Sequence, residues 1–130
     1  MIHDEICTYE VCKLAKEKGF PQRGIDSNKY WFENFKGIVE EVKDNVFLYE
    51  IYPESRLARQ TTQSLLQRWL REEKGYYTYP FFDNEELKWT YVVRERTGDM
   101  WIPLIGETPY YDKYEEAMEG ALKFVLENLV

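Results

Sequence analysis

The chain has 130 residues, of which 44% are hydrophobic and 32% charged, and its formal net charge is −7. This length fits one domain, and the composition is that of a globular protein and not of a disordered one. The negative charge argues against a general duplex-binding protein, because contacts between basic side chains and phosphates supply most of that affinity.

Residues 8–19 form the first predicted helix. Thr8 is a suitable N-cap, Glu10 lies in the first turn where the helix dipole favours an anion, and Gly19 suits the left-handed position after the last turn. The stripe that we expect to be buried consists of Cys7, Val11, Leu14 and Ala15, with Cys12 to one side of it.

Residues 21–35 contain the turn-forming types of a loop, yet they also include large apolar side chains. We expect this loop to be fixed to the core by Tyr30, Trp31, Phe32 and Phe35. Two strands are predicted next, at residues 37–43 and 46–52, because apolar residues alternate there. Asp44 and Asn45 between them suit a two-residue hairpin turn, since both residue types tolerate positive φ.

The clearest helix of the sequence runs over residues 61–74 and is ended by Gly75. Its predicted buried stripe is Leu65, Leu66, Trp69 and Leu70. Three strand-like runs follow, at residues 76–82, 87–94 and 100–105, and the second of them alternates most regularly.

A few single residues make the structural prediction for the second half of the chain more specific. Pro80 cannot donate a hydrogen bond to a sheet, so its strand is predicted to lie at an edge or to bend. Asp112 is the predicted N-cap of the last helix, with Glu115 three residues later in a capping-box arrangement. Gly120 lies in the middle of this helix and predicts a close approach between the helix and the sheet.

We therefore expect a single α+β domain over residues 1–130, with three helices packed on an antiparallel sheet of about five strands. The expected order of elements is α-β-β-α-β-β-β-α. The 61–74 helix, the 87–93 strand and the apolar side of residues 114–129 should share one dry interior.

The two cysteines help to predict the cellular compartment of the protein. On one helix, the Cα atoms of Cys7 and Cys12 would lie roughly 8–9 Å apart, which is too far for a disulfide. The chain has no apolar run of membrane-spanning length, and its start at Met1 does not resemble a signal peptide. Reduced thiols and the absence of both segments predict a cytoplasmic protein without a membrane partner.

No catalytic or cofactor-binding motif stands out, so we expect no catalytic residue, no cofactor and no metal. The single histidine, His3, lies near the N-terminus, which argues against nucleophilic triads and histidine-based zinc sites. Two alternatives stay open: Cys12 could be a reactive thiol, and carboxylates of the last helix could share a cation such as Mg²⁺. Acidic residues also favour helix starts for electrostatic reasons alone. The carboxylates in question are Asp112, Glu115, Glu116 and Glu119.

Aromatic residues make up 17% of the chain, and eleven of them are tyrosines. Tyrosine and tryptophan concentrate at protein interfaces. Alternate positions of a strand point in opposite directions, so not all of the clustered tyrosines can lie in the core. They predict a binding surface for a protein partner or a second copy, with ordinary partial burial as the alternative. These residues are Tyr76, Tyr77, Tyr79, Tyr110 and Tyr111.

The charge is unevenly distributed. Residues 56–74 hold five basic and two acidic side chains, whereas the segments before and after are net acidic. A helix with base-reading side chains and a following Tyr-rich hairpin resembles the recognition helix and wing of a winged-helix protein. Nucleic-acid binding is therefore the alternative function, although the net charge and the lack of a preceding helix argue against it. The side chains concerned are Gln63, Gln67, Arg68 and Arg71.

Three stretches resemble short uncharacterised proteins of gut-anaerobe bacteria, their phages and mobile elements. They are TYEVCKLAKEKGF at residues 8–20, TTQSLLQRWLRE at residues 61–72 and YEEAMEGAL at residues 114–122. That family has no assigned activity, so the resemblance implies an origin and no site residue. We expect a non-enzymatic protein-interaction or self-associating module of phage or mobile-element type.

Overall fold

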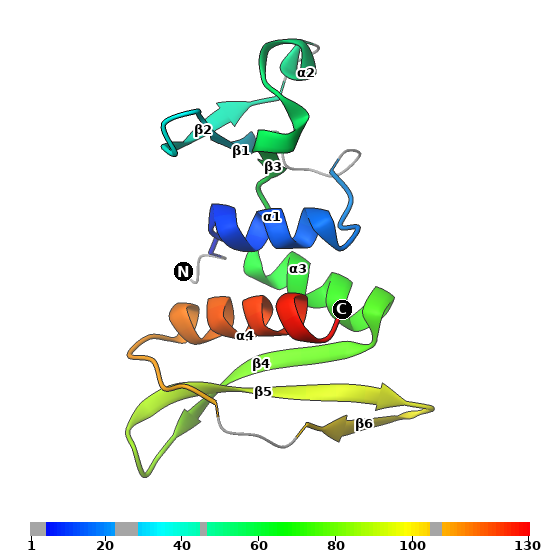
Figure 1. Cartoon of the computed structure of the whole chain (residues 1–130). Coiled ribbons are helices and arrows are strands. Elements are labelled where there is room, and N and C mark those ends of the chain that lie inside the picture. Colours follow the sequence, from blue (N-terminus) through cyan, green and yellow to red (C-terminus); the bar gives the residue numbers. More distant parts are fainter. Residues whose placement is uncertain (1–4, 23–28, 45–46, 105–107) are drawn as a thin grey trace. The chain divides into compact units, whose positions relative to one another are not determined.

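The computed structural model describes residues 5–22, 29–44, 47–104 and 108–130. This part of the chain is α+β, as predicted, with four α-helices and two three-stranded antiparallel sheets (Figure 1). By its internal contacts the chain divides into two compact units. One is Ile6–Thr61, and the other is Thr62–Val130 together with Glu5. The expected single domain over residues 1–130 stays a prediction.

The unit Ile6–Thr61 begins with α1 (Tyr9–Glu17). The side chain of Thr8 accepts a hydrogen bond from the backbone N–H of Val11, and Gly19 has a φ of 96°, so both predicted ends of this helix are confirmed. Cys12, which the predicted stripe left to one side, is buried. Its thiol donates to the carbonyl oxygen of Cys7 at 3.6 Å, and no disulfide joins the two cysteines, as expected.

The sheet of this unit has the order β2-β1-β3, with β1 at Lys29–Glu33, β2 at Val39–Lys43 and β3 at Leu57–Arg59. A loop was expected over residues 21–35, but Lys29–Glu33 within it form the strand β1, along which burial alternates. The loop prediction is wrong for these residues. The rest of that expectation, at residues 23–28, lies outside the described residues. β1 is the central strand and pairs with both β2 and β3. The described strands form two separate three-stranded sheets, so the expected single sheet of about five strands is wrong.

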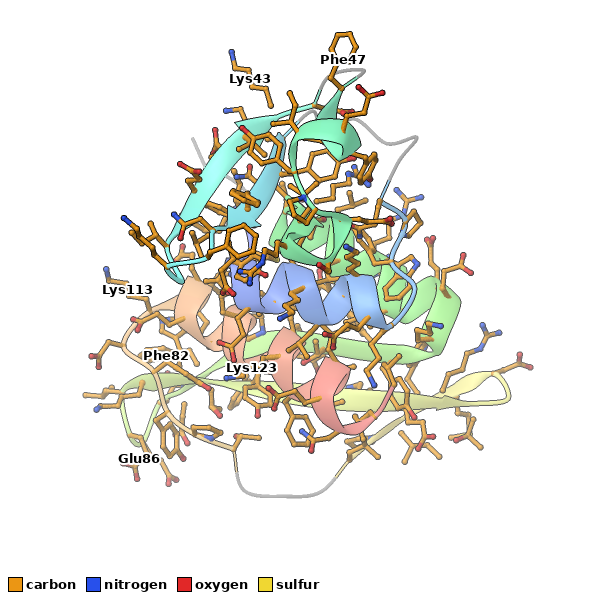
Figure 2. The ribbon with its side chains drawn as sticks, turned by 45° about the horizontal axis from the view of Figure 1, so that its top comes forward. Lys43, Phe47, Phe82, Glu86, Lys113 and Lys123 are labelled. Atoms are coloured by element: carbon orange, nitrogen blue, oxygen red, sulfur yellow. The ribbon has the colours of Figure 1, made fainter. Side chains whose placement is uncertain are left out.

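The strand and hairpin expected after residue 43 are also wrong. Residues Leu48–Ile51 form the one-turn helix α2, followed by the 3₁₀ helix η1 at Glu54–Arg56. Leu48 is only 1% exposed, whereas Phe47 and Ile51, expected on one strand face with Tyr49, are 56% and 61% exposed. Figure 2 shows Phe47 projecting away from the ribbon. Asn45 and Val46 lie outside the described residues.

The reason for this helix is the core that it completes. Leu48 packs in one apolar cluster with the strand residues Tyr30, Phe32 and Leu57. Val42, Tyr49 and Tyr52 are partly buried against the same cluster. Leu48 and Tyr49 lie in α2 and Tyr52 follows its last residue, so the turn brings all three to the cluster, whereas a strand would divide them between two faces.

The unit Thr62–Val130 begins with α3 (Gln63–Trp69), which continues through the π-helical turn η2 (Leu70–Lys74). Thr62 caps the start by accepting from the N–H of Leu65, and Gly75 ends the helix with a φ of 76°. The predicted helix over residues 61–74 and its stop signal are therefore confirmed, with the last turn widened into a π turn.

Three antiparallel strands follow in the order β4-β5-β6, with β4 at Tyr76–Asp83, β5 at Lys88–Thr97 and β6 at Met100–Pro103. All three strands were predicted; Ile105, the last residue of the third prediction, lies outside the described residues. Pro80 lies on the edge strand β4, as expected.

The last helix, α4 (Tyr114–Asn128), starts later than predicted. Its N-cap is Lys113, without a side-chain hydrogen bond, and not Asp112. The backbone of Tyr111 exchanges two hydrogen bonds with that of Trp89, of 2.7 and 2.9 Å. This pairing holds the chain along β5, where Asp112 lies 3.8 Å from Lys88 Nζ, so helical geometry begins only beyond it.

The three groups predicted to share a dry interior pack together, but Leu65, Trp69 and Trp89 are only half-buried and Leu87 is 72% exposed. Helix α4 packs on β4 and β5, and α3 packs on α4 and β4 (Figure 1). The buried side chains come from all of these elements; they include Leu66, Leu70, Tyr91, Val93, Ala117, Met118, Ala121, Leu122, Val125 and Leu126. Within the part of the chain described, none of the helices combines the length and the apolar character needed to cross a membrane.

Candidate interaction surface

The sheet of the second unit has two faces that differ sharply, and strand register assigns each residue to one of them. On one face, Tyr91 is only 6% exposed, and its ring lies 6.0 Å from that of Phe124 on α4. Trp89 on the same face meets Tyr114 of α4 at 5.3 Å between ring centroids. This is the face that the helices cover.

The opposite face collects aromatic and arginine side chains. Tyr77 pairs across the strands with Arg94, and Arg96 pairs with Trp101, so these four residues point to the same side. Tyr79 and Phe81 follow at alternate positions of β4. We call this set the aromatic-arginine face; its members are Tyr77, Tyr79, Phe81, Arg94, Arg96 and Trp101.

The side chains of this face contact one another. The ring of Tyr77 lies 5.1 Å from that of Tyr79 and 6.1 Å from that of Trp101, in an edge-on arrangement with the latter. Arg94 Nε donates to the hydroxyl of Tyr79 at 3.1 Å. The guanidinium of Arg71, from η2, lies 5.3 Å from the centroid of the Tyr77 ring. The result is one continuous cluster from β4 to β6.

This cluster is partly open to solvent. Phe81 is 50% exposed, Arg96 is exposed, and the other members are half-buried. At one end of the face, the hydroxyl of Thr90 bonds the side chain of Thr108 and the carbonyl of Pro109, so this part of the strand is covered. Tyr77 and Tyr79, toward the other end, are half-buried, and Arg71 lies over the Tyr77 ring.

The five tyrosines predicted as a binding surface do not form one surface. Tyr77 and Tyr79 come together on the aromatic-arginine face, whereas Tyr76 points to the other side of β4. Tyr111 packs between Trp89 and α4, with its ring 6.5 Å from that of Tyr91. Burial raises the pKa of the hydroxyls of both Tyr91 and Tyr111.

Tyr110 is exposed but has a local partner. Its hydroxyl donates to Asp83 Oδ2 at 3.0 Å. The other oxygen of Asp83 accepts from the N–H groups of Glu85 and Glu86, at 2.9 and 3.3 Å. These backbone bonds first, and then the Tyr110 hydroxyl, lower the pKa of Asp83, while the bond to Asp83 raises the pKa of Tyr110.

We expect Tyr110→Phe to raise the pKa of Asp83 toward its ordinary value, because one of three donors to the carboxylate is lost. The depressed pKa means that ionised Asp83 stabilises the folded protein above the unfolded-state pKa, and that this contribution disappears as pH falls through the folded-state pKa. An NMR titration of the Asp83 carboxyl carbon measures the shift, with Tyr111→Phe as the control that should leave it unchanged. Equal Asp83 pKa values in wild type and Tyr110→Phe would contradict this assignment.

The side chains proposed to read bases are largely engaged within the unit. Gln63 was predicted to read bases, but it is 4% exposed, and its amide donates to the carbonyl of Glu115 at 3.0 Å. Gln67 donates to the carbonyl of Thr78 at 2.7 Å. Both amides thus join α3 to neighbouring elements. Arg68 is exposed and forms an ion pair with Glu72 at 3.1 Å. Nucleic-acid binding through this helix stays a prediction.

Two further alternatives were a cation site on the last helix and a reactive thiol at Cys12. Among the described residues, no group of three or more His, Cys, Asp or Glu side chains is placed to hold a metal ion. Of the proposed carboxylates, Asp112 lies near Lys88, and Glu119 is 3.4 Å from the amide of Gln63. Cys12 is buried. His3 lies outside the described residues.

The sequence did not single out Phe81, Arg94, Arg96 or Trp101. A signal was present, because Tyr77, Tyr79 and Phe81 share the period of two that marks one face of a strand. Arg94 and Trp101 could be added only once the register of β5 with its two neighbours was known. The chain matches no protein-family model, no curated protein and no solved structure.

Proposed function

We propose that this chain is a non-enzymatic interaction module of phage or mobile-element type, which binds another protein or a second copy of itself through the aromatic-arginine face. Tryptophan, tyrosine and arginine are the residues that most often dominate binding energy at protein interfaces. The face joins all three types in contact, on the side of the sheet opposite the helices.

The observation that carries the proposal is the unequal use of the two sheet faces. The helix-covered face supplies the buried core residues Thr78, Tyr91 and Val93. The aromatic rings of the opposite face are therefore not required to complete that core. Rings that stay partly in solvent can release water when a partner covers them. Cys7 and Cys12 are not joined in a disulfide, which agrees with a cytoplasmic location for such a module.

The proposal is tested by a pull-down from a gut-anaerobe lysate together with size-exclusion chromatography and light scattering. The informative variant is Tyr79→Ser combined with Trp101→Ser, and the matched control is Tyr114→Ser, which removes an exposed tyrosine of α4 that packs on the helix-covered side. We expect wild type and the control to retain a partner or to self-associate, and the face variant to lose this. Thermal melts followed by circular dichroism establish that each variant is folded.

Two results would contradict the proposal. One is a wild-type protein that stays a strict monomer and retains no partner. The other is a partner retained equally by the face variant and by Tyr114→Ser.

A further inference from the structure

The arginines around the aromatic-arginine face have a distinctive charge environment. Arg71, Arg94 and Arg96 approach it from η2 and β5, in a chain whose net charge is −7. Among the described residues, none of these three forms an ion pair within 4.0 Å; Arg71 lies over Tyr77, Arg94 bonds Tyr79, and Arg96 donates to the carbonyl of Gly98. Their positive charge is therefore not neutralised by a bonded carboxylate there.

Strand geometry keeps carboxylates away from the middle of the same side. Glu95 lies between Arg94 and Arg96 in sequence, so its side chain points to the opposite face. In the register from Tyr77 to Phe81, from Thr90 to Arg96 and from Trp101 to Pro103, no described residue of this face is acidic. Asp83 and Lys88, which carry opposite charges, pair with each other at the far end of β4 and β5. The middle of the face is thus positive and aromatic.

We propose that the aromatic-arginine face binds an acidic stretch of polypeptide, an inference that rests on the proposed function and names its partner chemistry. Guanidinium groups recognise carboxylates through paired N–H donors, and such charge-assisted bonds are stronger than neutral ones. The rings of Tyr77, Tyr79 and Trp101 supply apolar area beside them. Charge complementarity on an otherwise acidic protein then selects which segment binds.

The geometry favours a polypeptide over single-stranded nucleic acid. Base-binding surfaces need open ring faces on which successive bases stack. Here Tyr77 and Tyr79 are tilted against each other by 46°, and Arg71 already lies over the Tyr77 ring. The net charge of −7 also repels a polyphosphate chain along most of its length.

Fluorescence anisotropy on the full chain tests the proposal with three labelled probes: a short peptide of alternating Glu and Thr, the same peptide with Gln in place of Glu, and oligo(dT). We expect the Glu peptide to bind at least about tenfold more tightly than the Gln peptide, in a salt-sensitive manner, since bonds to charged groups are worth that factor or more. Arg94→Gln and Arg96→Gln should each weaken binding of the Glu peptide. Arg68→Gln, which removes the same charge from an exposed helix position, should not.

Equal binding of the Glu and Gln peptides would overturn the proposal. So would oligo(dT) binding more tightly than the Glu peptide, with loss of that binding in Arg94→Gln. A lysate partner that is retained by Arg94→Gln and Arg96→Gln, but lost by the variant at Tyr79 and Trp101, would overturn the acidic partner while leaving the proposed function intact. Retention by all of these variants would contradict both.

Discussion

Replacing Leu48 with Ala is expected to lower the free energy of unfolding of the unit Ile6–Thr61 by about 2–5 kcal/mol. Leu48 is 1% exposed and lies in one apolar cluster with Tyr30, Phe32 and Leu57. Its truncation removes apolar contact and leaves a cavity that the short α2 helix and a small sheet can only partly close. Urea denaturation followed by the NMR signals of β1 residues measures the loss in this unit specifically.

The neighbours of Leu48 provide the matched controls. Phe47→Ala and Ile51→Ala remove as much or more apolar surface, yet both side chains are more than half exposed. Each is therefore expected to change the unfolding free energy by no more than about 0.5 kcal/mol. A loss from Phe47→Ala or Ile51→Ala as large as that from Leu48→Ala would instead support a strand at this position.

The second large effect is expected at Gly120. A Cβ atom at this position would lie 2.1 Å from the Tyr111 hydroxyl oxygen and 2.6 Å from Cζ of the same ring. The ring is rigid, and the Tyr111 backbone is held to Trp89 by two hydrogen bonds, so neither can move away easily. Gly120→Ala should therefore destabilise the second unit by about 1–3 kcal/mol through overpacking, although alanine is the better helix former.

A double-mutant cycle isolates the clash. Tyr111→Leu removes the three nearest atoms that a Cβ at residue 120 would meet, which are the hydroxyl oxygen, Cζ and Cε2 of the tyrosine. In that background Gly120→Ala should no longer destabilise and should gain up to about 1 kcal/mol from helix propensity. Tyr111→Phe keeps Cζ and should relieve the clash only in part. If Gly120→Ala were equally destabilising with Tyr and with Leu at residue 111, the close contact would not be its cause.

Much of the second unit could be predicted from the sequence because its signals are local. The helix over residues 61–74 has both an N-cap and a glycine stop, and β5 alternates over many residues. The predicted close approach at Gly120 is real, but its partner is the ring of Tyr111 and not the sheet. The start of α4 was misplaced because the pairing of Tyr111 with Trp89 is a contact between distant segments.

The first unit was harder to predict because its elements are short. Strand β3 has three residues, too few for a period to show. The alternation of residues 46–52 suits a strand, whereas the cluster around Leu48 favours a helical turn, so tertiary packing overrode the local pattern. Strand β1 was hidden because residues 21–35 mix turn-forming and aromatic types.

For the candidate surface, composition indicated tyrosines but could not predict which of them share one face. Tyr77 and Tyr79 were identified, while Tyr76, Tyr110 and Tyr111 face other surroundings. The arginines and Trp101 join the surface through the register of three strands, which no local pattern specifies. Gln63 looked like a surface residue by helical spacing, yet its amide bonds the carbonyl of Glu115, fifty-two residues away in sequence.

Hydroxyl-radical footprinting with mass spectrometry tests most directly whether the sheet of the second unit has one covered and one open face. Residues of the same type provide the comparison: we expect Phe81 to be oxidised faster than the buried Phe32, and Tyr79 faster than the buried Tyr91. Phe81 and Tyr79 as strongly protected as Phe32 and Tyr91 would show that the aromatic-arginine face is covered in the free protein, and would contradict its role as a binding surface.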